Sequence, residues 1–152
     1  MEDIKQIILD YVKSVELMTV CSVSRNKPWC ATVFFAFDSK LNLYFLSRNY
    51  RRHSKEIVKN PNVAGTIFSQ DFEFGKPVKG IQFEGVCKRQ SVRNISDYMV
   101  YLKRYPKAIE HATMDALRTS NEKGISLWKI VPKRIKIHDE KLFGSEGREL
   151  VL

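Results

Sequence analysis

The feature of this sequence that most constrains its fold is a run of short apolar segments joined by very short links. Residues 18–23, 31–37, 43–46 and 63–69 each have the length and the β-branched and aromatic content of a strand. The links among the first three fit hairpin turns, whereas a parallel connection needs a crossover of about a dozen residues or more. Antiparallel pairing is therefore expected, and repeated strands of this kind tend to close into a barrel.

Further strands are expected in the second half of the chain. From Ile81 onward the side chains alternate, which places Ile81, Phe83 and Cys87 on one face and polar residues on the other. Residues 125–131 and 134–138 then complete the predicted sheet.

Helical periodicity marks three regions around these strands. Apolar residues repeat at three- and four-residue steps over the first sixteen residues, and residues 51–60 and 94–118 also read as helical, the last with a break at Pro106. The tail, residues 142–152, contains glycines and is expected to be a loop. The element order predicts an α+β fold, mainly β with helices, and a single domain over residues 1–152.

Composition and charge set broad limits on function. Apolar residues make up 43% of the chain and aromatic residues 11%, which is typical of a globular protein. The formal net charge of +9 attracts nucleic acid, membrane surfaces or phosphorylated small molecules without choosing among them. No apolar run approaches the roughly 20 residues that span a membrane. Because the first residues also do not resemble a signal peptide, a cytoplasmic location is expected.

The cysteines favour the same compartment. Cys21, Cys30 and Cys87 are widely spaced, and each lies in an apolar stretch. We expect three reduced, buried thiols of a cytosolic protein. Since no CxxC motif is present and the histidines are scattered, neither a metal site nor a catalytic cysteine is expected.

The most informative polar segment is a basic turn that follows the strand at residues 43–46. Arg51, Arg52 and His53 fall in or near the first turn of the next helix. Cations are unfavourable there by about 0.3–1 kcal/mol each, because the N-terminal end of a helix is itself partly positive. A bound dianion would remove the conflict by accepting backbone N–H groups and pairing with Arg52 and His53, and Ser47 would add a hydroxyl donor. The alternative is a solvent-facing helix end, where screening makes the cost small.

Other candidate residues are less specific. Residues 80–85 have the outer spacing of a P-loop but lack its Lys-Ser/Thr pair, so a nucleotide triphosphatase is not expected. The amide of Gln82 can donate and accept, as a flavin ring edge requires, or it is simply exposed. Trp29 and Trp128 are expected to fill either the core or a subunit interface. A third alternative for Trp128 is that it covers an aromatic cofactor. The tyrosines of residues 94–118 line a substrate pocket or pack the helix onto the barrel.

Four segments, in their order and spacing, carry a resemblance to a known family. They are residues 29–38, 43–57, 80–85 and 127–132. With these segments the chain resembles the pyridoxamine 5′-phosphate oxidase-like FMN-binding split barrels, especially their small bacterial members, over residues 18–138. The resemblance implies an antiparallel split β-barrel, bound FMN, and a homodimer with FMN at the subunit interface.

The resemblance also implies which residues bind the cofactor. The matching positions are Thr32, Val33, Phe34, Leu46, Ser47, Arg52, His53, Gln82 and Trp128. In the family, the first strand contacts FMN largely through its backbone, and an Arg-Lys pair binds the phosphate. Arg52 and His53 match that pair, and Ser47 would lie near the phosphate. Gln82 or Trp128 would reach the flavin of the partner subunit.

Several positions depart from the family pattern. His53 replaces the lysine, so part of the charge at the phosphate would depend on pH. Ala36 and Gly80 stand where the vitamin-forming oxidase has lysine and glutamine, and its C-terminal Arg-x-His signature is missing. These departures leave the substrate unknown.

Three functional hypotheses remain from the sequence. The leading one is a dimeric, cytosolic FMN-dependent oxidoreductase in which the cofactor carries the hydride chemistry. The second is a non-enzymatic or haem-binding split barrel, which needs a histidine as axial ligand. The third is a basic nucleic-acid-binding module, which needs exposed aromatic residues. Phe34, Phe35 and Phe45 instead fall in strands that are expected to be buried.

Overall fold

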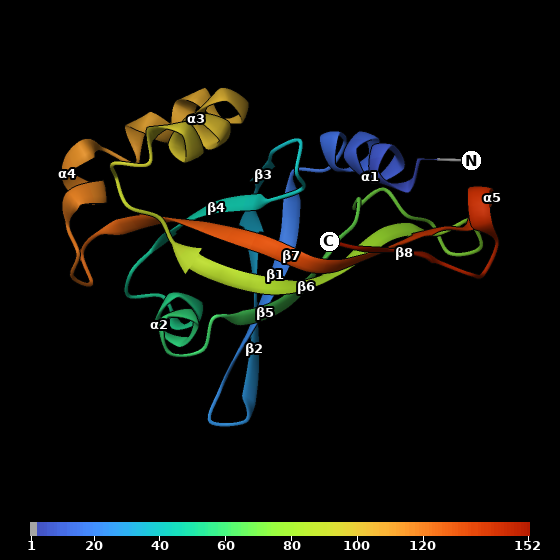
Figure 1. Ribbon diagram of the computed structural model, residues 1–152, viewed down its shortest axis with the longest axis horizontal. Coiled ribbons are helices and arrows are strands. Elements are labelled where there is room, and N and C mark those ends of the chain that lie inside the picture. The colour runs from blue at the N-terminus through green and yellow to red at the C-terminus, as the bar shows by residue number, and fades with distance from the viewer. Residues whose placement is uncertain (1–2) are drawn as a thin grey trace.

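The computed structural model describes residues 3–152 and shows an antiparallel sheet curled into a half-barrel (Figure 1). The strands are β1 Leu17–Ser24, β2 Lys27–Phe34, β3 Ala36–Phe37, β4 Leu43–Arg48, β5 Asn62–Ile67, β6 Lys79–Arg89, β7 Ile125–Asp139 and β8 Arg148–Val151. They follow the order β2-β1-β5-β6-β7-β4-β3, and β8 pairs with the C-terminal half of β7. This architecture confirms the α+β fold that the sequence predicts.

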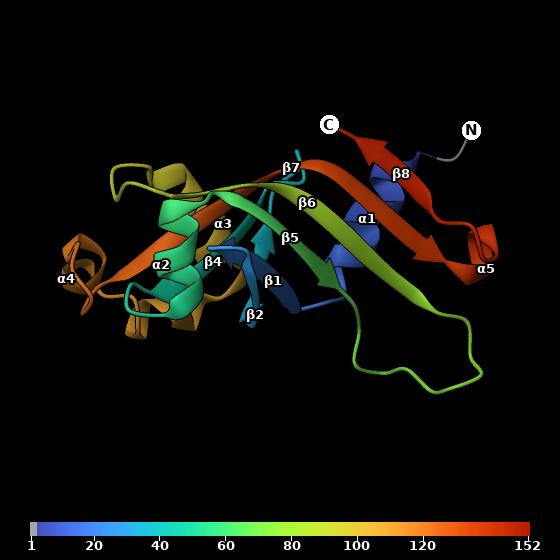
Figure 2. The same ribbon diagram turned by 90° about the horizontal axis from the view of Figure 1, so that it is seen from below.

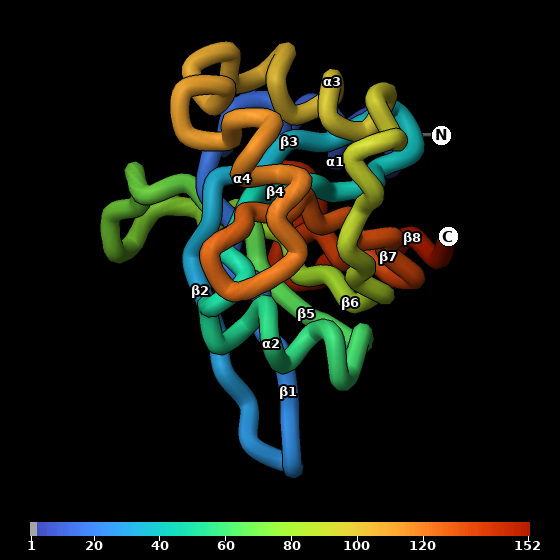
Figure 3. Tube along the Cα trace, turned by 90° about the vertical axis from the view of Figure 1, so that its left-hand side faces the viewer, coloured from blue at the N-terminus to red at the C-terminus, as the bar shows by residue number. Residues whose placement is uncertain are grey.

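The helices lie on both sides of the sheet. They are α1 Ile4–Lys13, α2 Arg52–Lys59, α3 Ile95–Arg104, the 3₁₀ helix η1 Pro106–Glu110, α4 Met114–Arg118 and α5 Glu140–Phe143. Figures 1 and 3 place α3 and α4 on one side and α2 on the other, with the β1–β2 turn far from α3. Figure 2 shows the β5–β6 loop extending away from the sheet. Within residues 3–152, no helix combines the length and the apolar character that crossing a membrane requires.

Most of the apolar core lies inside the curl of the sheet. Helix α1 begins after Asp3, whose carboxylate accepts the N–H of Gln6, and it buries Ile8 and Val12 in this core. Its Tyr11 hydroxyl donates to the carbonyl of Lys79 at 3.0 Å, which ties the helix to the start of β6. The helix ends earlier than its periodicity suggests, since Val15 joins the core from the following turn.

A second apolar cluster lies on the opposite face of β4 and β7, beneath α3. Its buried members are Ala36, Tyr44, Tyr98, Tyr101 and Leu127. Arg104 of α3 donates from Nη2 to the carbonyls of Val12 and Val15, at 3.2 and 2.5 Å. This contact joins the C-terminal end of α1 to α3, so the helical excursion is fixed to the barrel.

Strands β6 and β7 follow the sequence prediction closely. Phe83 and Cys87 are buried, whereas Gln82 and Lys88 are exposed on the other face. The two predicted terminal strands form the single strand β7, which continues past Pro132 where the register shifts beside Gly85. A Cβ at Gly85 would lie 2.4 Å from the carbonyl oxygen of Val131, so only glycine allows this close approach.

The structure corrects the prediction of three reduced, buried thiols. Cys21 and Cys30 face each other in the β1–β2 register and form a disulfide, and only Cys87 is a free buried thiol among the described residues. Residues on opposite strands come together through the hairpin register, which the linear spacing of the cysteines does not reveal.

Two further segments differ from the sequence prediction. The strand expected over residues 31–37 is divided, with β2 ending at Phe34, and β2 is exposed along much of its length. Trp29 and Phe34 are 45% and 53% exposed, so neither belongs to the core. The tail over residues 142–152 is not a loop, because it contains the end of α5 and the strand β8.

Candidate functional site

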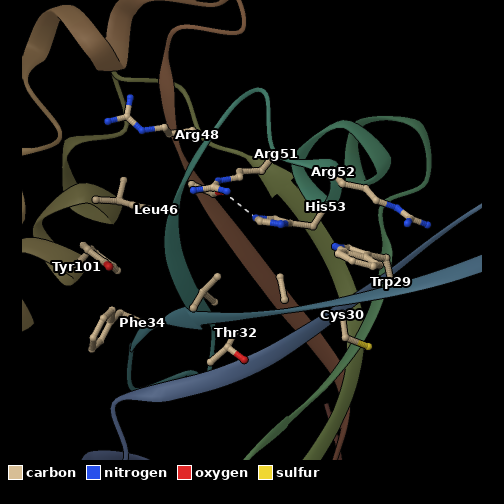
Figure 4. A pocket seen from close by; sticks show the side chains of 13 residues that line it. Trp29, Cys30, Thr32, Phe34, Leu46, Arg48, Arg51, Arg52, His53 and Tyr101 are labelled. Carbon is tan, nitrogen blue, oxygen red and sulfur yellow. Dashed lines mark hydrogen bonds between the residues drawn. The ribbon is translucent and has the colours of Figure 1, made fainter.

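A cavity of about 670 Å³ lies between β2, the end of β4 and the start of α2 (Figure 4). Its walls come from three separate parts of the chain. The lining residues are Trp29, Cys30, Ala31, Thr32, Val33, Phe34, Leu46, Ser47, Arg48, Arg51, Arg52, His53 and Tyr101. This volume lies within the range of about 300–1,000 Å³ that is usual for small-molecule sites.

Strand β2 forms the long wall of the cavity. It stands at one end of the strand order, so the edge facing away from β1 presents backbone N–H and C=O groups. Consecutive residues from Trp29 to Phe34 line the cavity, so the backbone edge of β2 borders it along with some of the side chains. Such a wall can hydrogen-bond to the edge of a flat polar ring.

The polar end of the cavity is a hydrogen-bonded group at the junction of β4 and α2. Ser47 Oγ lies 2.7 Å from His53 Nε2, and Ser54 Oγ donates to Ser47 Oγ at 3.2 Å. His53 is buried, and burial together with the nearby charge of Arg51 lowers its pKa below the ordinary value. The imidazole is therefore neutral at pH 7 when the cavity holds no anion.

The first turn of α2 faces this polar end with unpaired backbone donors. Arg51 occupies the N-cap position, with φ −62° and ψ 144°, and no side chain within residues 3–152 caps the helix. The first N–H groups of a helix have no partner inside the helix. Their partial positive charge and the arginines beside them make this end of α2 a binding place for an anion.

The two arginines at this turn have different surroundings. Arg52 donates from Nε to Glu56 Oε1 at 2.7 Å, and its guanidinium lies 4.4 Å from the centre of the Trp29 ring. Glu56 also accepts the hydroxyl of Ser22 at 2.6 Å, and these two hydrogen bonds lower its pKa. Figure 4 shows Arg52 turned toward Trp29, whereas Arg51 lies beside His53.

Most of the cofactor positions predicted from the sequence meet in this cavity. The predicted residues that line it are Thr32, Val33, Phe34, Leu46, Ser47, Arg52 and His53. Gln82 lies elsewhere, exposed on the outer face of β6. Trp128 is fully buried and stacks on Phe45 at 6.3 Å between ring centres, so it does not cover this cavity.

Six residues that line the cavity are not among the predicted cofactor positions: Trp29, Cys30, Ala31, Arg48, Arg51 and Tyr101. Arg48 ends β4 at the start of the basic turn, and Cys30 lies in β2 within the family segment at residues 29–38. Arg51 was part of the basic turn, but only the structure separates it from Arg52 and places it beside His53. Tyr101, one of the tyrosines expected near a pocket, arrives from α3 through the packing of that helix on the sheet.

Comparison with solved structures defines the class of the fold. A candidate pyridoxamine 5′-phosphate oxidase from Listeria innocua matches 89% of this chain and 98% of its own at 21% identity, with a TM-score of 0.65. General stress protein 26 from Bacillus anthracis matches 98% and 100% at 19% identity, with a TM-score of 0.65. HutZ, the haem storage protein of Vibrio cholerae, matches 96% and 92% at 14% identity, with a TM-score of 0.69. The chain therefore has the split half-barrel fold of the pyridoxamine 5′-phosphate oxidase-like proteins.

Comparison of sequences identifies the family. A UPF0306 protein of Photorhabdus laumondii is 29% identical over 144 residues, which cover 93% of this chain and 92% of the relative. A UPF0306 protein of Yersinia enterocolitica is 30% identical over 104 residues, which cover 67% and 70%. The chain belongs to the UPF0306 family, whose name states no activity. No family model matches the chain.

Proposed function

We propose that this protein binds FMN in the cavity between β2 and α2 and acts as an FMN-dependent oxidoreductase on a small molecule. The observation that carries the proposal is the uncapped first turn of α2, which brings Ser47, His53 and Arg51 to one end of a cavity large enough for a small-molecule cofactor. The shared fold with pyridoxamine 5′-phosphate oxidase-like proteins supports the same assignment.

The phosphate of FMN fits the polar end of the cavity. Backbone N–H groups of α2 and the hydroxyl of Ser47 are donors, and Arg51 supplies a positive charge beside them. A charge-assisted hydrogen bond contributes about 1.5–3 kcal/mol. A dianion next to His53 also favours protonation of the imidazole, so it raises the pKa of His53. Binding is then accompanied by proton uptake at pH values between the pKa of the free protein and that of the complex.

The ring system fits the opposite end. There the β2 edge offers backbone hydrogen bonds, while Leu46, Phe34 and Tyr101 supply apolar and aromatic surface. When bound, FMN would supply hydride and electron transfer, and the protein would supply position, electrostatics and exclusion of water. This division of roles agrees with the absence of a recognisable catalytic dyad from the sequence.

We further propose a homodimer with the cofactor at the subunit interface. Strand β2 is exposed on both faces, and its Trp29 and Phe34 present large apolar side chains to solvent. Exposed edge strands and apolar patches are typical places for pairing with another chain. A second copy over this edge would cover the open side of the cavity, and Gln82 of the partner is available for the flavin edge.

Haem is the competing ligand, because HutZ and a haem-binding protein from Mycobacterium smegmatis share the fold. Haem needs an axial ligand, and His53 is the histidine that lines the cavity. Its Nε2 is already hydrogen-bonded to Ser47, and its ring is held against Phe45. This arrangement favours FMN over haem.

The cofactor test is to purify the protein, denature it and identify any released chromophore. Flavin absorption, or its appearance after incubation of the apoprotein with FMN, is expected. A Soret band after incubation with haemin, together with no uptake of FMN, would contradict the proposal.

We place the protein in the cytoplasm. The structure pairs Cys21 and Cys30 in a disulfide, and the cytoplasmic thiol pool would reduce that bond. Both cysteines should then be recovered as free thiols when cells are lysed in acid and alkylated. Recovery of the protein in another compartment with the disulfide intact would contradict this location.

A further inference from the structure

A second cavity lies within the helical excursion, away from the candidate cofactor cavity. It measures about 650 Å³ and is enclosed by α3, η1 and α4. It shares no lining residue with the cavity beside α2. Its size is again that of a small-molecule site, but its walls are mainly aliphatic.

Helix α3 carries an apolar face that is wider than its packing on the sheet requires, and Tyr98 belongs both to the packed part and to the cavity wall. Tyr98 and Tyr101 are buried against the sheet, and they account for the packing of the helix. Ile95, Met99 and Leu102 follow a helical spacing on the side that lines the cavity. Packing on the sheet uses Tyr98 and Tyr101, so this packing alone does not explain why Ile95, Met99 and Leu102 are apolar.

The opposite wall of the cavity is also apolar and exposed. Ile109 of η1 and Met114 of α4 are large side chains that remain more than half accessible, and Ile95 across from them is 68% exposed. Exposed apolar clusters of this kind usually mark a binding site. The methionines make the walls adaptable, which suits a flexible ligand better than a rigid one.

Two cations border this apolar cavity. Arg93 and Arg118 both line it, and neither guanidinium forms a hydrogen bond or an ion pair with a residue of the range 3–152. Among residues 3–152, the arginines that form ion pairs with acidic side chains are Arg52 and Arg134. A planar guanidinium without a partner, next to aliphatic surface, is suited to a carboxylate at the end of an apolar chain.

We infer that this cavity binds an amphipathic carboxylate, a flexible aliphatic chain with one acidic end. The chain lies between Met99, Ile109 and Met114, and the carboxylate pairs with Arg93 or Arg118. A second copy of the protein is a poorer occupant, because two arginines would then be buried without an acid.

The methionines offer a direct test on the whole protein. Methyl signals of ¹³C-methionine-labelled protein are followed by NMR during titration with decanoate. Met99 and Met114 are expected to shift in a saturable way, whereas Met18, buried inside the barrel, is expected to stay unchanged. Decan-1-ol, which lacks the charge, should bind at least tenfold more weakly.

Variants connect the signals to the proposed contacts. Combined Arg93→Gln and Arg118→Gln should remove the preference for decanoate over decan-1-ol. Ile95→Glu should weaken decanoate binding at least tenfold, whereas Val58→Glu, an equally exposed aliphatic position on α2, should leave it unchanged.

Three outcomes would overturn the inference. The first is the absence of saturable shifts at Met99 and Met114. The second is equal affinity for the acid and the alcohol. The third is a set of shifts that depends on protein concentration without ligand, because it would show that a second copy occupies the cavity.

Discussion

Strands β6 and β2 belong to the same sheet but use their apolar residues in different ways. β6 has a neighbour on each side, and its alternation buries Phe83 and Cys87 while it exposes Gln82. β2 has β1 on one side and the cavity on the other, and its Phe34 is half-exposed. In the middle of the sheet, apolar side chains build the core. At the edge they build a surface on which a ligand or a partner can bind.

The largest expected effect comes from removing a core ring of β6. Phe83→Ala should reduce the free energy of unfolding by about 3–5 kcal/mol, because it leaves a cavity where the side chain is 4% exposed. Urea denaturation measures this loss. A change below about 1 kcal/mol would show that β6 is less central than the structure indicates.

The next effect concerns the anion-binding turn beside β2. Arg51→Ala should weaken FMN binding by about 1.5–3 kcal/mol, roughly 10- to 150-fold, because a charge next to the phosphate is lost. Lys88→Ala on the exposed face of β6 is the matched control and should leave the affinity unchanged. An equal loss of FMN affinity in both variants would show that the effect comes from the net charge of the protein and not from the position of Arg51.

The buried histidine at this turn predicts a pH dependence of stability. Burial and the charge of Arg51 lower the pKa of His53 below 6.5, so the unfolded chain binds a proton at a higher pH than the folded protein does. The stability is therefore complete above about pH 6.5 and falls as the pH drops through the folded pKa. Urea midpoints from pH 7.5 to 5 should fall less steeply in His53→Gln than in the unmodified protein. Parallel curves would contradict this origin.

The smallest expected effect on stability is at the edge strand. Phe34→Ala should change the free energy of unfolding by less than about 0.5 kcal/mol, since the ring is 53% exposed. The same variant should weaken self-association in sedimentation experiments, because the ring belongs to the proposed dimer surface. A large loss of stability with unchanged self-association would show that Phe34 of β2 serves the core, as Phe83 of β6 does, and not a binding surface.

The sequence predicts the parts of the fold in which side-chain pattern and neighbours agree. The alternation from Ile81 onward identified β6, and the break at Pro106 divided the helical excursion as expected. The position of a strand within the sheet could not be predicted in the same way. The apolar residues 31–34 look like a buried strand, and only the strand order shows that β2 is an edge.

The candidate site was predictable where its residues lie close together in the sequence. Ser47 and His53 are six residues apart in the basic turn, which predicted both at one anion site, whereas their hydrogen bond to each other is seen only in the structure. Tyr101 reaches the cavity because α3 packs on the sheet, and Trp128 points into the core, where it stacks on Phe45. No pattern in the sequence predicts either orientation. The disulfide between Cys21 and Cys30 likewise depends on hairpin register.

The central claim is that the first turn of α2 binds the phosphate of a flavin. The most direct measurement compares the affinities of the apoprotein for FMN and for riboflavin, which has the same ring but no phosphate. FMN should bind at least 100-fold more tightly, and Arg51→Ala should reduce that ratio. Equal affinities for the two flavins, or failure to bind FMN, would contradict the account.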